Sequence, residues 1–287
     1  MTNAFDYATA FSRNIGWVTQ AEQATLSHKR VALAGMGGVG GFHLMTLVRL
    51  GIQRFHIADL DHFELANWNR QAGATLSSLG QHKAQVLARM AREINPDCEI
   101  GVFPEGVTSQ NMDAFFAGVD LYIDGLDFFA FGAREAVFQH CADRRIPATT
   151  VAPLGLSGAL LNFMPGRMNF EQYFQLAGRS DLVKAVHLLV GLAPAMLHLP
   201  YLADKTRVDL AAHRGPSTVM ACQLCAGIAA SEALKILLGR GKVWAAPHGV
   251  QFDGYRNKLA RTWRPGGNRN PLNRLAIAIA RRQLGIK

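Results

Sequence analysis

The hydrophobic pattern over the first 160 residues alternates between short apolar runs and longer segments with a helical repeat. The short runs are bounded by glycine, proline or charged residues, which is typical of buried strands. The longer segments repeat their apolar positions every three or four residues, which is typical of amphipathic helices. We expect strands at 30–35, 54–59, 98–106, 119–124 and 147–155, and helices at 41–51, 82–96 and 133–146.

This alternation of strands and helices predicts the fold class. Parallel strands need a crossover connection, usually a helix, so a β-α-β-α-β order favours a parallel sheet wound with helices. We therefore expect an α/β protein with a Rossmann-like, doubly wound, mainly parallel sheet, helices on both faces and a mixed C-terminal extension. The pattern is irregular over 165–216, and 217–239 then predicts one long helix with Ser217 and Gly239 as its caps.

The charge of the chain is concentrated at its C-terminal end. Residues 254–287 carry nine Lys and Arg and no Asp or Glu, so residues 1–253 carry 21 residues of each sign and are neutral. We predict a single domain over 1–253, in which 165–216 is a crossover segment that shapes the substrate site. The basic tail over 254–287 then accounts for the net charge of +9, which points to an anionic partner.

The tail also has a helical apolar pattern. Arginines at 274, 281 and 282 are interleaved with apolar residues at helical spacing, namely Leu272, Leu275, Ala276 and Ile279. Such a helix would contact a membrane surface, or anchor a nucleic acid through its phosphates, or pack as an ordinary terminal helix.

The apolar segment 185–203 contains no charged residue and approaches the length of a membrane span. Two prolines and two histidines interrupt it, so we expect a pair of buried helices there. The N-terminus lacks the pattern of a signal peptide, and four cysteines do not make a disulfide framework in a chain of 287 residues. We expect a cytoplasmic location.

A glycine-rich loop, GMGGVG at 35–40, lies between the first predicted strand and the helix that follows it. Glycines at its first, third and sixth positions allow a tight turn, close approach of the backbone to phosphate, and close packing of the helix. Asp59 ends the next strand, where a carboxylate can hold ribose hydroxyls. The loop alone does not distinguish NAD, FAD and ATP, and a plain tight turn is the structural alternative.

The segment ADLDHFELANWNRQ at 58–71 adds polar groups that a redox cofactor does not need. An enzyme that cleaves a triphosphate must neutralise charge on the leaving pyrophosphate, and Arg70 and Lys83 supply two cations. Asn67 can orient phosphate or ribose oxygens. Asp127 follows the strand at 119–124, where it could hold Mg²⁺ and converge with Asp59 at the carboxyl ends of the strands.

Five segments occur in the order and spacing of the ThiF/MoeB/HesA family: GMGGVG, DLDHFELANWNRQ, LGQHKAQV, INPDCEI and YIDGLD. The resemblance covers residues 10–160 and resumes in ASEALKILLG at 230–239. Members of this family are ubiquitin-activating-type adenylyltransferases, which bind Mg-ATP and adenylate a carboxylate. The resemblance implies ATP and Mg²⁺ as cofactors. It also implies a carboxylate-bearing substrate, which is a ubiquitin-like protein, a peptide, or the threonylcarbamoyl group of a modified tRNA.

The resemblance also assigns roles to individual residues. It implies that nucleotide binding involves Gly35, Gly37, Gly38, Gly40, Asp59, Asp61, Asn67, Asn69 and Gln71. It implies that the catalytic residues are Arg13, Arg70, Lys83 and Asp127, with Asp127 also holding Mg²⁺. Arg13 resembles the N-terminal arginine that reaches into the neighbouring subunit's site in this family, which implies a homodimer.

The chain departs from the family pattern in its cysteines. Many relatives hold a zinc ion on two CxxC pairs, whereas this chain has one pair, Cys222 and Cys225, within an apolar small-residue helix. Cys98 and Cys141 do not form a second pair, so we expect core packing, with a redox dithiol as the alternative, and no zinc site. No cysteine lies in 150–216, so we expect no thioester intermediate unless Cys222 or Cys225 serves. Phe128 follows Asp127 where many relatives have asparagine, which would alter contacts to adenine or metal.

Two other functions fit part of the pattern. An NAD-linked oxidoreductase would use the glycine loop and Asp59, but it has no use for Arg70 and Lys83. A non-catalytic module that keeps the nucleotide fold and binds a peptide or protein partner is suggested by the missing cysteines. The full set of polar residues at the nucleotide site argues against this second alternative.

Overall fold

The computed structural model describes residues 5–286. The chain divides into two compact units. The first unit consists of Met1–Gly125 and Ala226–Val243, and the second consists of Leu126–Cys225 and Trp244–Lys287. The predicted division into a domain at 1–253 and a tail stays a prediction.

The first unit contains four parallel strands in the order β3 (Glu99–Phe103), β2 (Arg54–Ala58), β1 (Arg30–Ala34) and β4 (Leu121–Asp124). Val31 of β1 pairs with Phe55 of β2 on one side and with Leu121 of β4 on the other. β4 is buried at every position, and β1 and β2 at all but their first residue. Such continuous burial is what a parallel sheet covered by helices requires. The predicted parallel, Rossmann-like sheet is confirmed.

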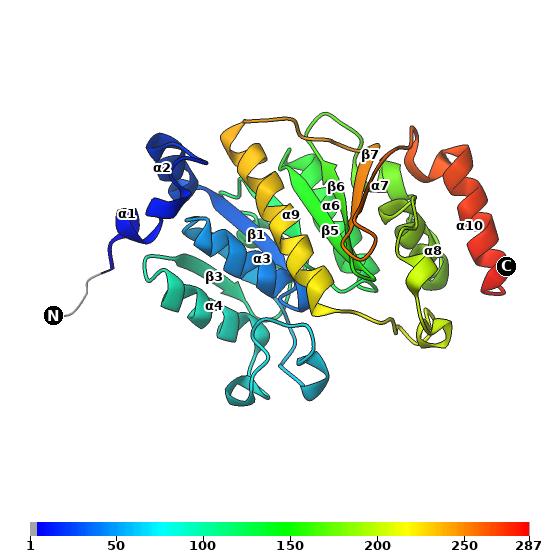
Figure 1. Cartoon of the computed structure of the whole chain (residues 1–287), viewed down its shortest axis with the longest axis horizontal. Helices are drawn as coiled ribbons and strands as arrows, with labels where there is room; N and C mark the ends of the chain where they lie inside the picture. The colour runs from blue at the N-terminus through cyan, green and yellow to red at the C-terminus, as the bar shows by residue number, and fades with distance from the viewer. Residues whose placement is uncertain (1–4, 287) are drawn as a thin grey trace. The chain divides into compact units, whose positions relative to one another are not determined.

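Two helices of the first unit position its loops. α3 (Gly38–Arg49) and α4 (Lys83–Ile94) pack against each other and against β1 and β3 respectively, and both lie in front of these strands in Figure 1. α3 begins three residues before its predicted start, inside the glycine-rich loop. The remaining helical segments are α1 (Tyr7–Ala10), η1 (Ser12–Asn14), α2 (Gln20–His28), η2 (Leu65–Asn67), η3 (Leu76–Ser78), α5 (Met112–Phe115) and the part of α9 (Val219–Leu238) that begins at Ala226.

The second unit is built on antiparallel strands. β5 (Ala148–Leu154), β6 (Ser157–Phe163), β7 (His248–Asp253) and β8 (Lys258–Trp263) pair in sequence order. This is the mixed extension that the sequence predicts. Its helices are α6 (Phe131–Asp143), α7 (Phe170–Phe174), α8 (Asp181–Leu192) and α10 (Pro271–Gln283), with short turns η4 (Leu199–Tyr201), η5 (Lys205–Arg207) and η6 (Gly267–Arg269).

The core of the second unit is aromatic. The rings of Phe138 and Phe170 stack with centroids 4.4 Å apart, and Phe163, Tyr173 and Phe174 pack around them. Aromatic pairs in these geometries contribute roughly 0.5–1.5 kcal/mol beyond their buried area. They join α6 and α7 to β6.

Two apolar segments differ from their predicted structure. In 185–203, α8 ends at Leu192 and turns follow, so the predicted helix pair is wrong. α9 (Val219–Leu238) is confirmed as a long helix, but Thr218 rather than Ser217 precedes it, and the Thr218 hydroxyl accepts from the Ala221 amide. Among the residues described, α9 alone is long and apolar enough to cross a membrane, and half of it is buried, as in a core helix.

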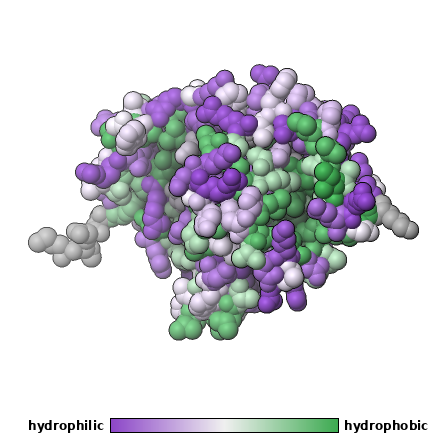
Figure 2. Space-filling view, turned by 45° about the vertical axis from the view of Figure 1, so that its right-hand side comes forward, coloured by the Kyte–Doolittle hydropathy of each residue, from purple (hydrophilic) through white to green (hydrophobic). Residues whose placement is uncertain are grey.

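The segment predicted as a basic tail folds as β8 and α10. Ile277 of α10 packs on Val186 and Val190 of α8. Of the apolar positions noted in the sequence, Leu272, Leu275 and Ile279 lie exposed, while Ala276 packs with Ile277. Hydrophobic side chains accordingly gather near the C-terminal end on the face that Figure 2 brings forward.

Candidate functional site

The glycine-rich loop joins β1 to α3 in the first unit. Gly35 has a φ of 87° and its amide donates to the carbonyl of Ala58 at 2.7 Å. A Cβ at Gly40 would lie 1.7 Å from the Gly35 carbonyl oxygen, so only glycine fits there. Gly37 is the N-cap of α3 and Gly38 is its first residue. Neither residue has a side chain that could cover the first backbone amides of the helix. Such a helix terminus is a ready site for phosphate.

Asp59 follows β2 and ties the glycine loop to the next strand. Its Oδ2 accepts from the amide of Met36 at 2.6 Å, and its Oδ1 accepts from the amide of Asp61 at 2.8 Å. Burial raises the pKa of Asp59, while these two hydrogen bonds and the charge of Lys83 oppose the rise. Each carboxylate oxygen has a second lone pair, so Asp59 can still accept from a ribose hydroxyl.

Lys83 begins α4 and is a nearly buried cation. Its side chain is 7% exposed, and its Nζ lies 2.9 Å from Oδ2 of Asp61, whose side chain is 58% exposed. The Lys83 amide also donates to the Asp61 carbonyl at 2.9 Å. The sequence assigned both residues to the site without indicating that they pair. A buried ammonium held by one half-exposed carboxylate can exchange that partner for phosphate oxygens.

The segment after Asp61 presents an arginine and three amide side chains. Arg70 donates from Nη1 to the Ala66 carbonyl and to Oδ1 of Asn69, both at 3.0 Å, so Asn69 orients the guanidinium. Asn67 is buried, and its Oδ1 accepts from the Glu64 amide at 3.0 Å. The carbonyl end of Asn67 therefore holds the turn at η2 rather than facing a ligand.

Gln71 faces the glycine loop. A Cβ on Gly37 would lie 3.8 Å from Gln71 Nε2, and Oε1 of Gln71 is buried without a hydrogen-bond partner in the structure. Buried amide oxygens are nearly always satisfied, so an unpaired one beside this loop is suited to accept from a water or from a donor on a bound ligand.

Two features of this region were missed by sequence reasoning. Gly125, directly after β4, would place a Cβ 2.4 Å from the Gly35 carbonyl oxygen, so the end of β4 packs against the glycine loop. His43 of α3 is fully buried with both ring nitrogens unpartnered, and burial lowers its pKa to about 4, opposed by the charge of Asp124. Gly125 lies within the YIDGLD motif, but His43 has no signal in the sequence.

Asp127 belongs to the second unit, where it is exposed. Its Oδ1 accepts from the Phe129 amide at 2.9 Å. The buried guanidinium of Arg134 donates to three consecutive carbonyls, those of Leu126 at 2.7 Å, Asp127 at 2.9 Å and Phe128 at 3.1 Å. Arg134 was also missed by sequence reasoning, and it fixes the backbone that carries Asp127.

The metal role of Asp127 stays a prediction. Residues 5–286 contain no group of three or more His, Cys, Asp and Glu side chains that could hold a metal ion. Asp59 and Asp127 lie in different units, so their convergence stays a prediction.

The sequence profile of the ThiF family matches residues 11–274. The chain belongs to the ThiF family.

Similar proteins extend this comparison. The chain is 34% identical to the tRNA threonylcarbamoyladenosine dehydratase of Bacillus subtilis over 138 residues, which is 48% of this chain and 54% of that protein. It is 26% identical to the sulfur carrier protein ThiS adenylyltransferase of Escherichia coli over 143 residues, which is 50% of this chain and 56% of that protein. The chain thus spans about half the length of the curated relatives it matches.

A solved structure shows the same fold. The tRNA N6-threonylcarbamoyladenosine dehydratase of E. coli in complex with AMP matches with a TM-score of 0.60 and 20% identity. The match covers 83% of this chain and 98% of that one. The Rossmann-like fold of the ThiF family is therefore confirmed for this chain.

The cysteines of this ThiF-family chain are buried. Cys222 and Cys225 lie in α9 with no exposed surface, and burial raises the pKa of Cys225 well above its usual range. Burial also raises the pKa of Cys98 to about 11. The thiolate is both the nucleophile and the metal ligand, so a thiol with a raised pKa is poorly suited to either role.

Arg13 lies on η1 and is exposed. The homodimer in which it would reach a neighbouring site stays a prediction.

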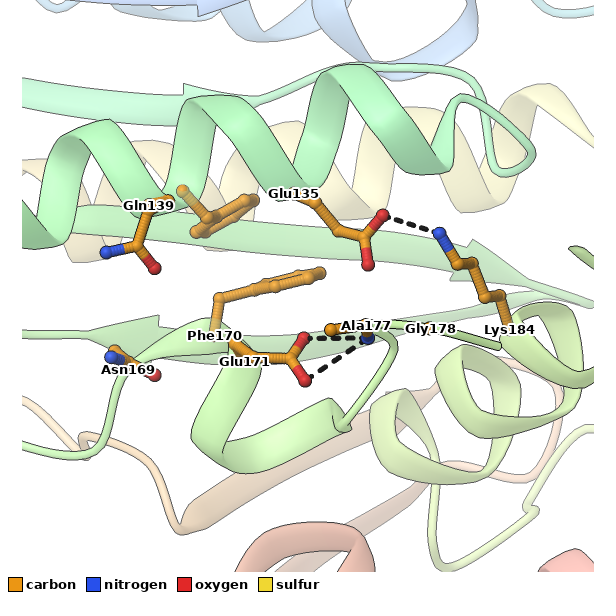
Figure 3. Close-up of a pocket in the computed structure, with 9 residues that line it drawn as sticks. Glu135, Gln139, Asn169, Phe170, Glu171, Ala177, Gly178 and Lys184 are labelled. Carbon is orange, nitrogen blue, oxygen red and sulfur yellow. Dashed lines mark hydrogen bonds and ion pairs between the residues drawn. The ribbon is translucent and has the colours of Figure 1, made fainter. Parts of the chain in front are cut away.

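A separate cavity of about 350 Å³ lies in the second unit (Figure 3). Figure 3 shows that charged side chains lining this cavity bind other groups of the protein. Lys184 Nζ lies 2.7 Å from Oε2 of Glu135, and Glu171 accepts from the amide of Ala177 at 3.2 Å. None of the site residues predicted from the sequence lines this cavity.

Proposed function

We propose that this ThiF-family protein is an ATP-dependent adenylyltransferase that activates a carboxylate as an acyl-adenylate and releases pyrophosphate. The proposal depends most on the nearly buried ammonium of Lys83, which pairs with Asp61. Asp61 lies two residues after Asp59, whose carboxylate accepts from the glycine loop. A redox cofactor keeps its pyrophosphate intact and needs no such cation. A leaving pyrophosphate needs such a cation, because negative charge develops on it.

The residues of the first unit fit the parts of ATP. The amides at the start of α3 bind phosphate oxygens, and Asp59 accepts from the ribose. The unpaired Oε1 of Gln71 accepts from a donor on the nucleotide. Lys83 and Arg70 neutralise the charge that develops on the β- and γ-phosphates as they leave.

The reaction is a substitution at the α-phosphorus. The carboxylate oxygen of the substrate bonds to that phosphorus as the bond to the bridging oxygen of pyrophosphate breaks. A nucleophile on a second molecule then attacks the acyl carbon, and AMP leaves. The protein contributes orientation and charge neutralisation, because this reaction needs no covalent intermediate on the chain.

Magnesium is part of this proposal, with Asp127 as its ligand. The Asp127 carboxylate is exposed on a backbone that Arg134 holds fixed, which suits a hard cation that keeps several waters and binds through one carboxylate and substrate phosphates. When bound, Mg²⁺ supplies further neutralisation of the triphosphate.

The substrate is proposed as a class. The carboxylate belongs to a modified tRNA, a ubiquitin-like sulfur carrier or a peptide, and residues 165–216 shape the choice.

The protein acts as a homodimer in which Arg13 completes the partner's site. Exposed apolar side chains beside Arg13, namely Ile15 and Trp17, support this assembly, since a second copy would bury them.

The test is calorimetric titration of the full chain with Mg-ATP and, separately, with NAD. We expect Mg-ATP to bind the wild type and not Lys83→Ala, because the variant lacks the buried cation. Lys184→Ala is the matched control, since Lys184 is also a partly buried, ion-paired lysine and should leave ATP binding unchanged. Pyrophosphate exchange would then be measured with tRNA and with small glycine-ended proteins. NAD binding, or equal ATP binding by Lys83→Ala and the wild type, would overturn the proposal.

A further inference from the structure

One face of β7 and β8 in the second unit is open to solvent. On β7, the half-buried His248, Val250 and Phe252 alternate with buried residues that point to the other face. The antiparallel register places Trp263 of β8 opposite His248 and Arg261 opposite Val250. Trp263 is 62% exposed and Arg261 is also exposed.

Three aromatic rings and one guanidinium form a row on this face. We call Trp244, His248, Arg261 and Trp263 the ring face. The His248 ring lies 5.1 Å from that of Trp244 and 6.4 Å from that of Trp263, with only 28° between the planes of the last pair. The guanidinium of Arg261 lies over Trp244, 5.7 Å from the ring centroid. These contacts hold the rings against one another and leave Trp263 largely uncovered.

The exposed charge near the ring face is positive. Residues 254–287 contain no carboxylate side chain, and β8 carries Lys258 and Arg261 between Arg256 and Arg264. Asp253 ends β7 opposite Lys258, but its side chain is buried and accepts from the Tyr201 hydroxyl at 2.7 Å. The exposed cations therefore produce a positive potential that attracts a polyanion.

We propose that the ring face binds a single-stranded segment of RNA. Every base has a π-face that can stack on Trp263, and Arg261, on the same face of β8, can meet a phosphate of the same RNA strand. RNA fits better than DNA because folded RNA presents unstacked bases in its loops, whereas DNA is mostly duplex.

A membrane surface is the competing occupant. The exposed Leu272, Leu275 and Ile279 of α10 could enter a bilayer, but they lie on another element. The ring face instead presents flat rings packed on a sheet and interleaved with a guanidinium, which matches stacking bases better than acyl chains.

This inference does not rest on the proposed function, because it assigns an RNA-binding surface to residues that the adenylation chemistry does not use. Where the carboxylate belongs to a modified tRNA, the ring face would hold part of that same substrate. The ring face lies wholly in the second unit, whereas the glycine loop and Lys83 lie in the first. RNA binding can therefore be measured without nucleotide. Failure of ATP binding would overturn the proposed function and leave the RNA result standing.

The test is fluorescence anisotropy of the full chain with a labelled oligouridylate of about 12 nucleotides. We expect Trp263→Ala to weaken binding by roughly tenfold through loss of base stacking, and Trp263→Phe to retain most of it. Leu76→Ala removes an apolar side chain that is 85% exposed in the first unit and is the control, with an expected affinity equal to that of the wild type.

The charge contribution is tested through salt. We expect Arg261→Ala to reduce the slope of log affinity against log salt by about 0.7, the change for one phosphate contact on a single strand. Arg167→Ala removes the same charge from an exposed site elsewhere in the second unit and should leave the slope unchanged. Thermal unfolding of each variant confirms that it is folded.

Two results would overturn the inference. One is equal oligouridylate affinity for the wild type, Trp263→Ala and Trp263→Phe. The other is the absence of oligouridylate binding together with binding to vesicles of phosphatidylglycerol that Leu275→Ser abolishes, which would identify α10 as a lipid-binding helix instead.

Discussion

Lys83 Nζ lies 2.9 Å from Oδ2 of Asp61, and the lysine is buried while the aspartate is mostly exposed. The pair is therefore asymmetric. Lys83 depends on Asp61 for compensation of its charge, whereas Asp61 is solvated without Lys83.

This asymmetry predicts how Asp61→Asn behaves. The variant leaves a nearly buried ammonium without its carboxylate, so we expect a loss of about 1–2 kcal/mol in the free energy of unfolding without ligand. Mg-ATP should raise the melting temperature more in the variant than in the wild type, because the phosphates supply the missing anion. Thermal unfolding with and without Mg-ATP measures both effects. A smaller rise in the variant would show that Asp61 itself contacts the nucleotide.

The glycine loop yields a matched pair of substitutions. Gly40→Ala puts a Cβ against the Gly35 carbonyl, so we expect a loss of about 1–3 kcal/mol in stability together with loss of ATP binding. Gly37→Ala meets only Gln71 Nε2 at 3.8 Å, so the fold should persist while the methyl group hinders the phosphates. Urea unfolding and calorimetric titration separate the two outcomes. Wild-type affinity in Gly37→Ala would place the triphosphate elsewhere.

Arg134 should act at a distance on the proposed Mg²⁺ site. Arg134→Met removes donors from three consecutive carbonyls, and we expect a loss of about 2–3 kcal/mol in stability. In variants that remain folded, the Mg²⁺ concentration needed for half-maximal pyrophosphate exchange should rise, because the backbone carrying Asp127 is less fixed. Arg134→Lys keeps the charge but not the planar fork of donors, so it should restore stability and the Mg²⁺ dependence only in part. An unchanged Mg²⁺ dependence in Arg134→Met would separate this loop from metal binding.

The buried imidazole of His43 should make the folded protein less stable at acidic pH. Burial lowers its pKa to about 4, from about 6.5 in the unfolded chain. Between these values the unfolded chain binds a proton that the folded chain does not, so stability falls as the pH falls through this window. The slope for one group is at most about 1.4 kcal/mol per pH unit. His56, His187 and His198 also have lowered pKa values, so the whole slope has several sources.

The comparison of His43→Leu with the wild type isolates the contribution of His43. Urea unfolding at pH 7.5 and pH 5 should show a smaller loss of stability in the variant. Equal losses in the two proteins would show that His43 is protonated alike in the folded and unfolded states.

The strands of the first unit were predictable because the signal for them is local. A run such as that of β1 is apolar and bounded by a charged residue and a glycine, and each predicted strand there contains the observed one. The early start of α3 was not predictable from propensity, since glycines disfavour a helix, and the packing of Gly40 against Gly35 is visible only in the structure.

Other features depend on contacts that sequence does not express. Arg134 binds backbone carbonyls, which every residue possesses, so no pattern of side chains indicates its partners. The packing face of α10 could not be assigned from the sequence, because Leu272 and Ile279 are as apolar as Ile277 and only α8 distinguishes them. The pairing of Lys83 with Asp61 likewise depends on how α4 follows β2.

The first unit is assembled from two stretches of chain separated by one hundred residues, since Met1–Gly125 is joined there by Ala226–Val243. On the ribosome, a nascent chain that has emerged as far as Gly125 holds the whole glycine loop, Asp59 and Lys83, but not the rest of their unit. The second unit is likewise completed only by residues after Val243. Neither unit can finish folding before most of the protein has been made, so nascent chains interrupted earlier would be substrates for chaperones and proteases rather than partial ATP-binding proteins.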